Sequence, residues 1–104
     1  MKSYLIFLIL IFFSTSSYSD DMLELAKQGD ASAQSNLGLI YANGEGVPEN
    51  HVRAYVWLSM AKTQGYERAK KWVETVKNLM TKQQIAQAQA LATKCYESDY
   101  KDCD

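Results

Sequence analysis

The chain has 104 residues, enough for one small domain together with a short leader. Its formal net charge of −1 gives it no general attraction for polyanionic nucleic acids, so we expect no nucleic-acid partner. One histidine and two cysteines are too few for a metal centre, so we expect no metal and no cofactor.

The first 19 residues have the layout of a secretory signal peptide. Lys2 gives a charged start, residues 4–13 are an unbroken apolar run, and small polar residues lead to a cleavage site after Ser19, with cleavage after Ser17 as the alternative. An uncleaved membrane anchor fits less well, because this run forms a helix of only about 15 Å against roughly 30 Å of hydrocarbon. We therefore expect export to a bacterial periplasm or medium, with no stable membrane insertion after cleavage.

The remaining segment, residues 20–104, contains an internal repeat. Gln28–Ala33 resembles Gln64–Ala69, which lies 36 residues later. A fixed period of that size indicates a helical repeat array. Asp21–Gln28 then corresponds to the end of a helix whose full-length copy is His51–Gln64.

The first long helix is expected to span about Ala31 to Ala42. Asp30 is a favourable N-cap, and Gly44 just beyond the end favours a left-handed C-cap. Gly38 inside the helix costs about 1 kcal/mol relative to alanine, which is sensible only if a second helix packs closely there. The apolar stripe of this helix consists of Ala33, Leu37 and Tyr41.

A turn over Gly44–Glu49 leads to a second helix, capped by Asn50 and running to about Thr63. The turn begins like a phosphate-binding glycine loop, but no strand precedes it, so we do not expect a nucleotide site. The inward stripe of this helix consists of Ala54, Trp57, Leu58 and Ala61.

A third helix is expected over Glu67–Met80. One repeat period after Gly38 stands Glu74, whose side chain prevents a close approach of two backbones. Lys77 likewise takes the place of Tyr41, so the array is expected to stop at this helix. The residues expected to face the core are Ala69, Trp72, Val73, Val76 and Met80.

Thr81–Gln84 is a capping box that starts a fourth helix, expected over about Lys82–Tyr96. One side of this helix is apolar, and the opposite side carries glutamine and lysine. A polar outer face is what the open end of a repeat array requires. No segment shows the alternation of a strand, so we expect an all-α fold. The apolar side consists of Ile85, Ala88, Leu91 and Ala92.

Both cysteines, Cys95 and Cys103, lie near the end of the chain. An even count in an exported chain favours a structural disulfide, with two free thiols as the alternative. Such a bridge would supplement the small core of a domain of this length.

A set of small, aromatic and glycine positions in the first two long helices resembles the pattern of a Sel1-like repeat, a relative of the tetratricopeptide repeat. The resemblance implies an α-solenoid fragment of antiparallel helix pairs, with one complete repeat at about 31–65 and a C-terminal helical cap at about 66–104. The tail over residues 80–92 is also similar to the closing helix that follows the last repeat in this family. The positions that carry the resemblance are Ala33, Leu37, Gly38, Tyr41, Gly44, Gly46, Val47, Ala54, Trp57, Ala61, Gly65 and Ala69.

In related repeats, the face of the first helix that does not carry the packing residues lines a concave groove. The resemblance therefore implies a partner-binding surface on that face and on the equivalent face one period later. The basic residues between 68 and 77 are read as a solvated helix face and not as a phosphate site. The expected surface consists of Ser32, Ser35, Leu39 and Asn43, followed by Arg68, Lys71, Thr75 and Asn78.

The resemblance implies a protein–protein interaction or adaptor module that binds a protein or peptide of the envelope or extracellular space. We expect no enzyme, because the only histidine, His51, lies beside an N-cap, and Asp20 and Asp21 would lie at a mobile N-terminus. Two alternatives are a hydrolase or binder in cell-wall or β-lactam chemistry and an accessory piece that completes a larger repeat assembly. The sequence leaves the partner and the oligomeric state open.

Overall fold

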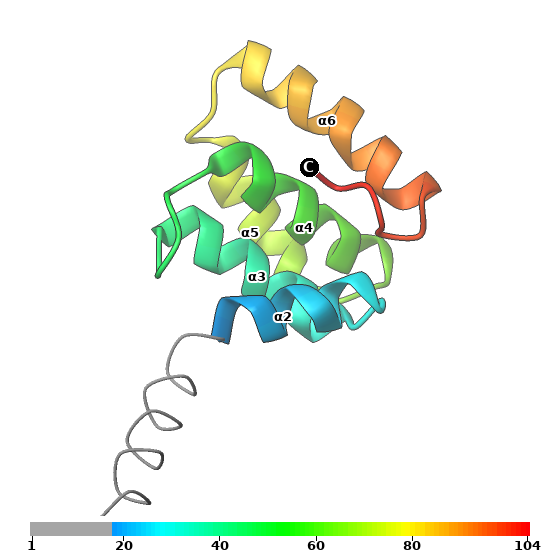
Figure 1. Ribbon diagram of the computed structural model, residues 1–104. Coiled ribbons are helices and arrows are strands. Elements are labelled where there is room, and N and C mark those ends of the chain that lie inside the picture. The colour runs from blue at the N-terminus through cyan, green and yellow to red at the C-terminus, as the bar shows by residue number, and fades with distance from the viewer. Residues whose placement is uncertain (1–17) are drawn as a thin grey trace, which may run out of the picture.

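The computed structural model describes residues 18–104, and within them every regular element is a helix (Figure 1). The predicted all-α fold is therefore confirmed. Most of the expected signal peptide, residues 1–17, lies outside the described range. Among the described helices, none is both long enough and apolar enough to cross a bilayer. The helices are α2 (Tyr18–Lys27), α3 (Ala31–Asn43), α4 (His51–Thr63), α5 (Glu67–Lys77) and α6 (Lys82–Glu97).

The caps predicted for the first two long helices are present. The Asp30 side chain accepts a hydrogen bond of 2.9 Å from the backbone N–H of Ala33. The Asn50 side chain accepts one of 3.0 Å from the backbone N–H of Arg53. Gly44 ends α3 with φ 68°, a left-handed conformation that glycine adopts without steric cost. These local signals fix the bounds of α3 and α4 to within one residue of the sequence prediction.

Helices α3 and α4 pack closely at Gly38, as its position predicted. A Cβ atom built on Gly38 would lie 2.6 Å from Leu58 Cγ and 3.1 Å from the carbonyl oxygen of Ala54. The space that any side chain would need is therefore filled by α4. Glycine is required here because α4 leaves no room for a side chain. Its backbone conformation is not the reason, since its φ is not in the left-handed region.

Helix α4 contributes to two apolar clusters and so holds the domain together. On one side, Trp57 and Met60 pack with α2, α3 and the C-terminal cysteines. On the other side, Ala54 and Leu58 pack with residues of α5. Trp57 is only 1% exposed, which makes it the largest fully buried side chain of the described residues.

A buried glutamine links the α2–α3 turn to the turn that follows α4. Both turns lie at the end of the α3–α4 hairpin opposite its connecting loop. Gln34 is fully buried and donates from Nε2 to the carbonyl oxygen of Ala26 over 3.0 Å. Gln64 Nε2 in turn lies 2.9 Å from Gln34 Oε1 and 3.0 Å from the carbonyl oxygen of Gly29, and donates to both. The α2–α3 turn is thus tied to the end of α4 by polar contacts as well as by packing.

Helix α5 differs from its prediction in two respects. It ends at Lys77 and not at Met80, because Asn78 caps it and the chain must reverse before the α6 capping box at Thr81. Trp72, which was expected in the core, is 39% exposed. The buried stripe of α5 consists of Ala69, Val73 and Val76.

Helix α6 closes the array by packing on α4, with little contact to α5. The predicted capping box is formed: Thr81 Oγ1 accepts from the N–H of Gln84 over 3.1 Å, and Gln84 Oε1 accepts from the N–H of Thr81 over 2.9 Å. On its apolar side, Ala88 is fully buried, whereas Ile85 is only partly buried. Helix α6 therefore does not pair with α5 in the way that α4 pairs with α3.

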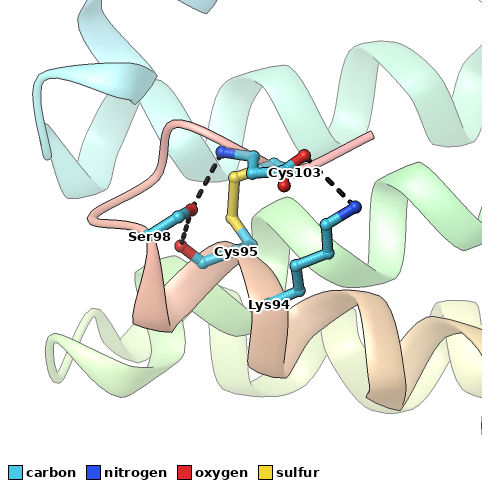
Figure 2. A network of polar contacts seen from close by, with 5 residues as sticks. Lys94, Cys95, Ser98 and Cys103 are labelled. Atoms are coloured by element: carbon cyan, nitrogen blue, oxygen red, sulfur yellow. Dashed lines mark hydrogen bonds and ion pairs between the residues drawn. A yellow bond between two sulfur atoms is a disulfide. The ribbon is translucent and has the colours of Figure 1, made fainter.

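The predicted Cys95–Cys103 disulfide is present, and both cysteines are buried (Figure 2). The Ser98 hydroxyl donates to the Cys95 carbonyl oxygen over 3.0 Å and accepts from the N–H of Asp102 over 2.9 Å. Lys94 Nζ lies 3.3 Å from Asp102 Oδ1. These contacts fold the C-terminal segment back beneath α6, where it helps to cover the core (Figure 1).

Gly38→Ala tests the close approach of α3 and α4. Alanine in place of an exposed helical glycine stabilises a helix by about 1 kcal/mol. Here the methyl group would overlap Leu58, so we expect the free energy of unfolding to fall by about 1–3 kcal/mol, measured by urea denaturation. The substitution should cost less in a Leu58→Ala background, and a Gly38→Ala protein that is more stable than the parent would contradict the contact.

Removal of the disulfide should destabilise the domain. The bridge closes a short loop, so we expect Cys95→Ala/Cys103→Ala to lower the free energy of unfolding by about 2–3 kcal/mol. Reduction of the parent protein should have a similar effect and should leave the double variant unchanged. Reaction of the folded parent with a thiol reagent before any reduction would show that the bridge is absent.

Candidate functional site

A hollow opens between α3 and α5, and its lining includes no residue of α4. Its volume is about 550 Å³. We call it the α3–α5 hollow. Its lining combines apolar and aromatic side chains with charged ones, which is the composition of a binding surface more than of a packed core. The lining residues are Ser35, Asn36, Leu39, Tyr66, Glu67, Arg68, Lys71 and Trp72.

Helix α3 forms one wall of the hollow. Ala33, Leu37 and Ile40 face the core, so the stripe that carries Ser35 and Leu39 points toward α5. Leu39 is partly buried and gives the hollow an apolar surface, whereas Ser35 is only 3% exposed. The packing of the hairpin thus decides which side chains of α3 a partner can reach.

The first two turns of α5, with the residue before them, supply the opposite side. Ala69 is buried and Val73 packs with residues of α4, so Arg68, Lys71 and Trp72 are turned toward the hollow. Tyr66 precedes the helix in extended conformation and makes no side-chain capping bond. A large aromatic ring that stays 39% exposed beside a hollow is a common feature of interfaces.

Four of the eight predicted surface residues line the hollow together: Ser35, Leu39, Arg68 and Lys71. The other four are exposed on the same two helices or, for Asn78, at the C-cap of α5, but they do not line it. These four are Ser32, Asn43, Thr75 and Asn78.

Sequence reasoning missed the other half of the lining, namely Asn36, Tyr66, Glu67 and Trp72. A signal for Trp72 was available, because it follows Arg68 by four positions and therefore shares its helix face. Tyr66 lies before the helix begins, where helical spacing gives no guide.

The charges around the hollow are unevenly paired. Glu67 Oε1 lies 3.1 Å from Lys70 Nζ in an exposed pair three residues apart, a contact that contributes little to stability. Arg68 and Lys71 have no carboxylate within 4.0 Å in the described part of the chain. The hollow therefore presents positive charge to whatever approaches it.

The residues considered for catalysis are placed elsewhere. His51 Nε2 lies 3.4 Å from Glu49 Oε1, at the turn that precedes α4, as its position beside the N-cap predicted. Asp20 and Asp21 belong to the first turn of α2. Within residues 18–104 the side chains form no cluster suited to holding a metal ion.

The Sel1 repeat family model matches residues 31–66, which run from the start of α3 to the residue before α5. No curated protein and no solved structure matches the chain. Sel1 repeats generally mediate protein–protein interaction and are typically not enzymes. The predicted residue pattern, the helical hairpin and this match agree, so the segment 31–66 is one Sel1-like repeat.

Proposed function

We propose that the chain is an interaction or adaptor module that binds a segment of another protein in the α3–α5 hollow. The observation that carries the proposal is Trp72, which stays 39% exposed and lies with Leu39 in a hollow of about 550 Å³. A surface aromatic in a concave, partly apolar site offers more binding energy per contact than a flat polar face.

We further propose that the chain is exported, and that its partner lies in the envelope or outside the cell. The buried Cys95–Cys103 disulfide supports this, since such bridges persist in oxidising compartments and are rare in the cytosol. The charged start and the apolar run of the first 19 residues support it as well.

Site-specific crosslinking in living cells tests the binding surface. A photoreactive amino acid at Asn36, which lines the hollow, should crosslink to a discrete partner protein. The same amino acid at Gln87, exposed on α6, serves as the matched control and should not. Crosslinks of equal pattern from both positions would contradict binding in the hollow.

Leu39→Asp should abolish the crosslink from position 36, because it places a charge in the apolar part of the hollow. Leu39 is only partly buried, so the circular dichroism spectrum should stay unchanged. Trp72→Ala provides a second test at an exposed position, where loss of the aromatic anchor should weaken binding at least about tenfold. Undiminished crosslinking and binding in both variants would rule out the hollow as the binding site.

Export predicts a processed N-terminus. Protein recovered from the envelope fraction or medium should begin at Asp20, or at Tyr18 if cleavage follows Ser17, and should contain the disulfide. N-terminal sequencing and intact mass measure both features. Recovery of an unprocessed chain with free thiols from the cytosol would contradict export and would leave the proposed binding surface unaffected.

A further inference from the structure

We propose that the α3–α5 hollow selects an acidic segment of its partner protein. Such a segment would place a bulky apolar side chain between Leu39 and Trp72 and carboxylates beside Arg68 and Lys71. The inference rests on the function proposed above and adds the chemistry of the occupant. It follows from the charges and the apolar lining of the hollow.

The first argument is the unbalanced charge of the hollow. Within residues 18–104, neither Arg68 nor Lys71 has a carboxylate within 4.0 Å, whereas Arg53, for example, lies 3.4 Å from Asp104. Glu67 is the one carboxylate among the lining residues, and its Oε1 lies 3.1 Å from Lys70 Nζ. Two positive charges are thus left for a partner to pair.

This positive charge is local. Residues 18–104 contain ten basic and twelve acidic side chains, so the described part of the chain is acidic on balance. Opposite charges across an interface steer the encounter and fix the register of binding, while like charges placed opposite each other reject the wrong partner. A basic hollow on an acidic domain therefore favours acidic segments over basic ones.

The second argument is the apolar lining. Leu39 and Tyr66 are partly buried and Trp72 is 39% exposed, so all three retain surface that a ligand can cover. The volume of about 550 Å³ lies within the range of about 300–1,000 Å³ found for sites that enclose compact groups. One or two bulky side chains of a peptide would fill it.

These two features together favour a peptide over a nucleic acid. Two free cations beside a glutamate offer few phosphate contacts, and affinity for nucleic acid depends on the number of phosphates neutralised. An amphipathic peptide matches both features at once, because its apolar residues dock in the groove and its charges meet those at the edge.

Selection from a random peptide library displayed on phage tests the preference, with the purified full chain as the target. Enriched sequences should carry aspartate or glutamate around a tryptophan, phenylalanine or leucine. Fluorescein-labelled copies of these peptides, titrated by anisotropy, should bind more weakly as salt is raised, because exposed charge pairs are screened.

Arg68→Glu/Lys71→Glu should weaken binding of these peptides at least about tenfold, because two attractions become repulsions. Peptides in which lysine replaces the acidic residues should regain affinity for this variant. Lys62→Glu/Lys82→Glu is the matched control: it changes the net charge equally at exposed positions that do not line the hollow, and it should leave affinity nearly unchanged.

The inference would be overturned if the selection enriched basic or uncharged peptides, or none at all. It would also be overturned if the two double variants lost affinity for the acidic peptides equally. Preferential binding of a single-stranded oligonucleotide, or self-association in sedimentation that disappears in Arg68→Glu/Lys71→Glu, would overturn it as well, since another occupant would then use these cations. If uncharged peptides were enriched and lost binding in Leu39→Asp, only the charge preference would be wrong. The crosslink from position 36 tests the proposed function separately.

Discussion

The close contact of α3 with α4 at Gly38 is the constraint on which the rest of the structure depends. Because Leu58 and the Ala54 carbonyl group occupy the space of a side chain, α3 lies against α4 with Gly38 at the point of contact. That orientation buries Leu37 and leaves Leu39 toward α5. The absence of a side chain at Gly38 thus influences which side chains of α3 lie at the surface.

Helix α4 transmits this constraint to the remainder of the domain. Its two faces take part in different apolar clusters, so α5 is positioned by one face while α2, α6 and the C-terminal segment are positioned by the other. The α3–α5 hollow exists because both of its walls pack on α4 and have little direct contact with each other. A stable α4 is therefore a condition for a preformed binding surface, which reduces the entropy lost on binding.

Features that depend on local chemistry could be predicted from the sequence. The caps at Asp30, Asn50 and Thr81 follow from side chains that compete for free backbone N–H groups, and they fix the starts of α3, α4 and α6. The internal repeat and Gly38 indicated the hairpin and its close contact.

Features that depend on the angle between helices could not be predicted in the same way. Asn43 is the last residue of α3 and Asn78 is the C-cap of α5, so both lie beyond the part where the two helices enclose the hollow. Trp72 was assigned to the core because it is large and apolar, yet Val73 occupies the buried position beside it. Buried Gln34 was missed because its partners, Ala26 and Gln64, come from other elements and meet only in the folded chain.

The C-terminal segment takes the place of a further repeat unit. Asp99 and Tyr100 have φ values of 54° and 66°, a left-handed conformation that costs non-glycine residues about 1–2 kcal/mol each. Tyr100 is nevertheless held there, because its ring packs beside Gly29 and onto the core, and because the Cys95–Cys103 bridge closes the loop around it. A chain with one matched repeat thereby covers apolar surface that a neighbouring repeat would cover in a longer array. A short hollow offers a partner few contacts, so the affinity must come from a few well-placed anchors, of which Trp72 is the most exposed aromatic in the hollow.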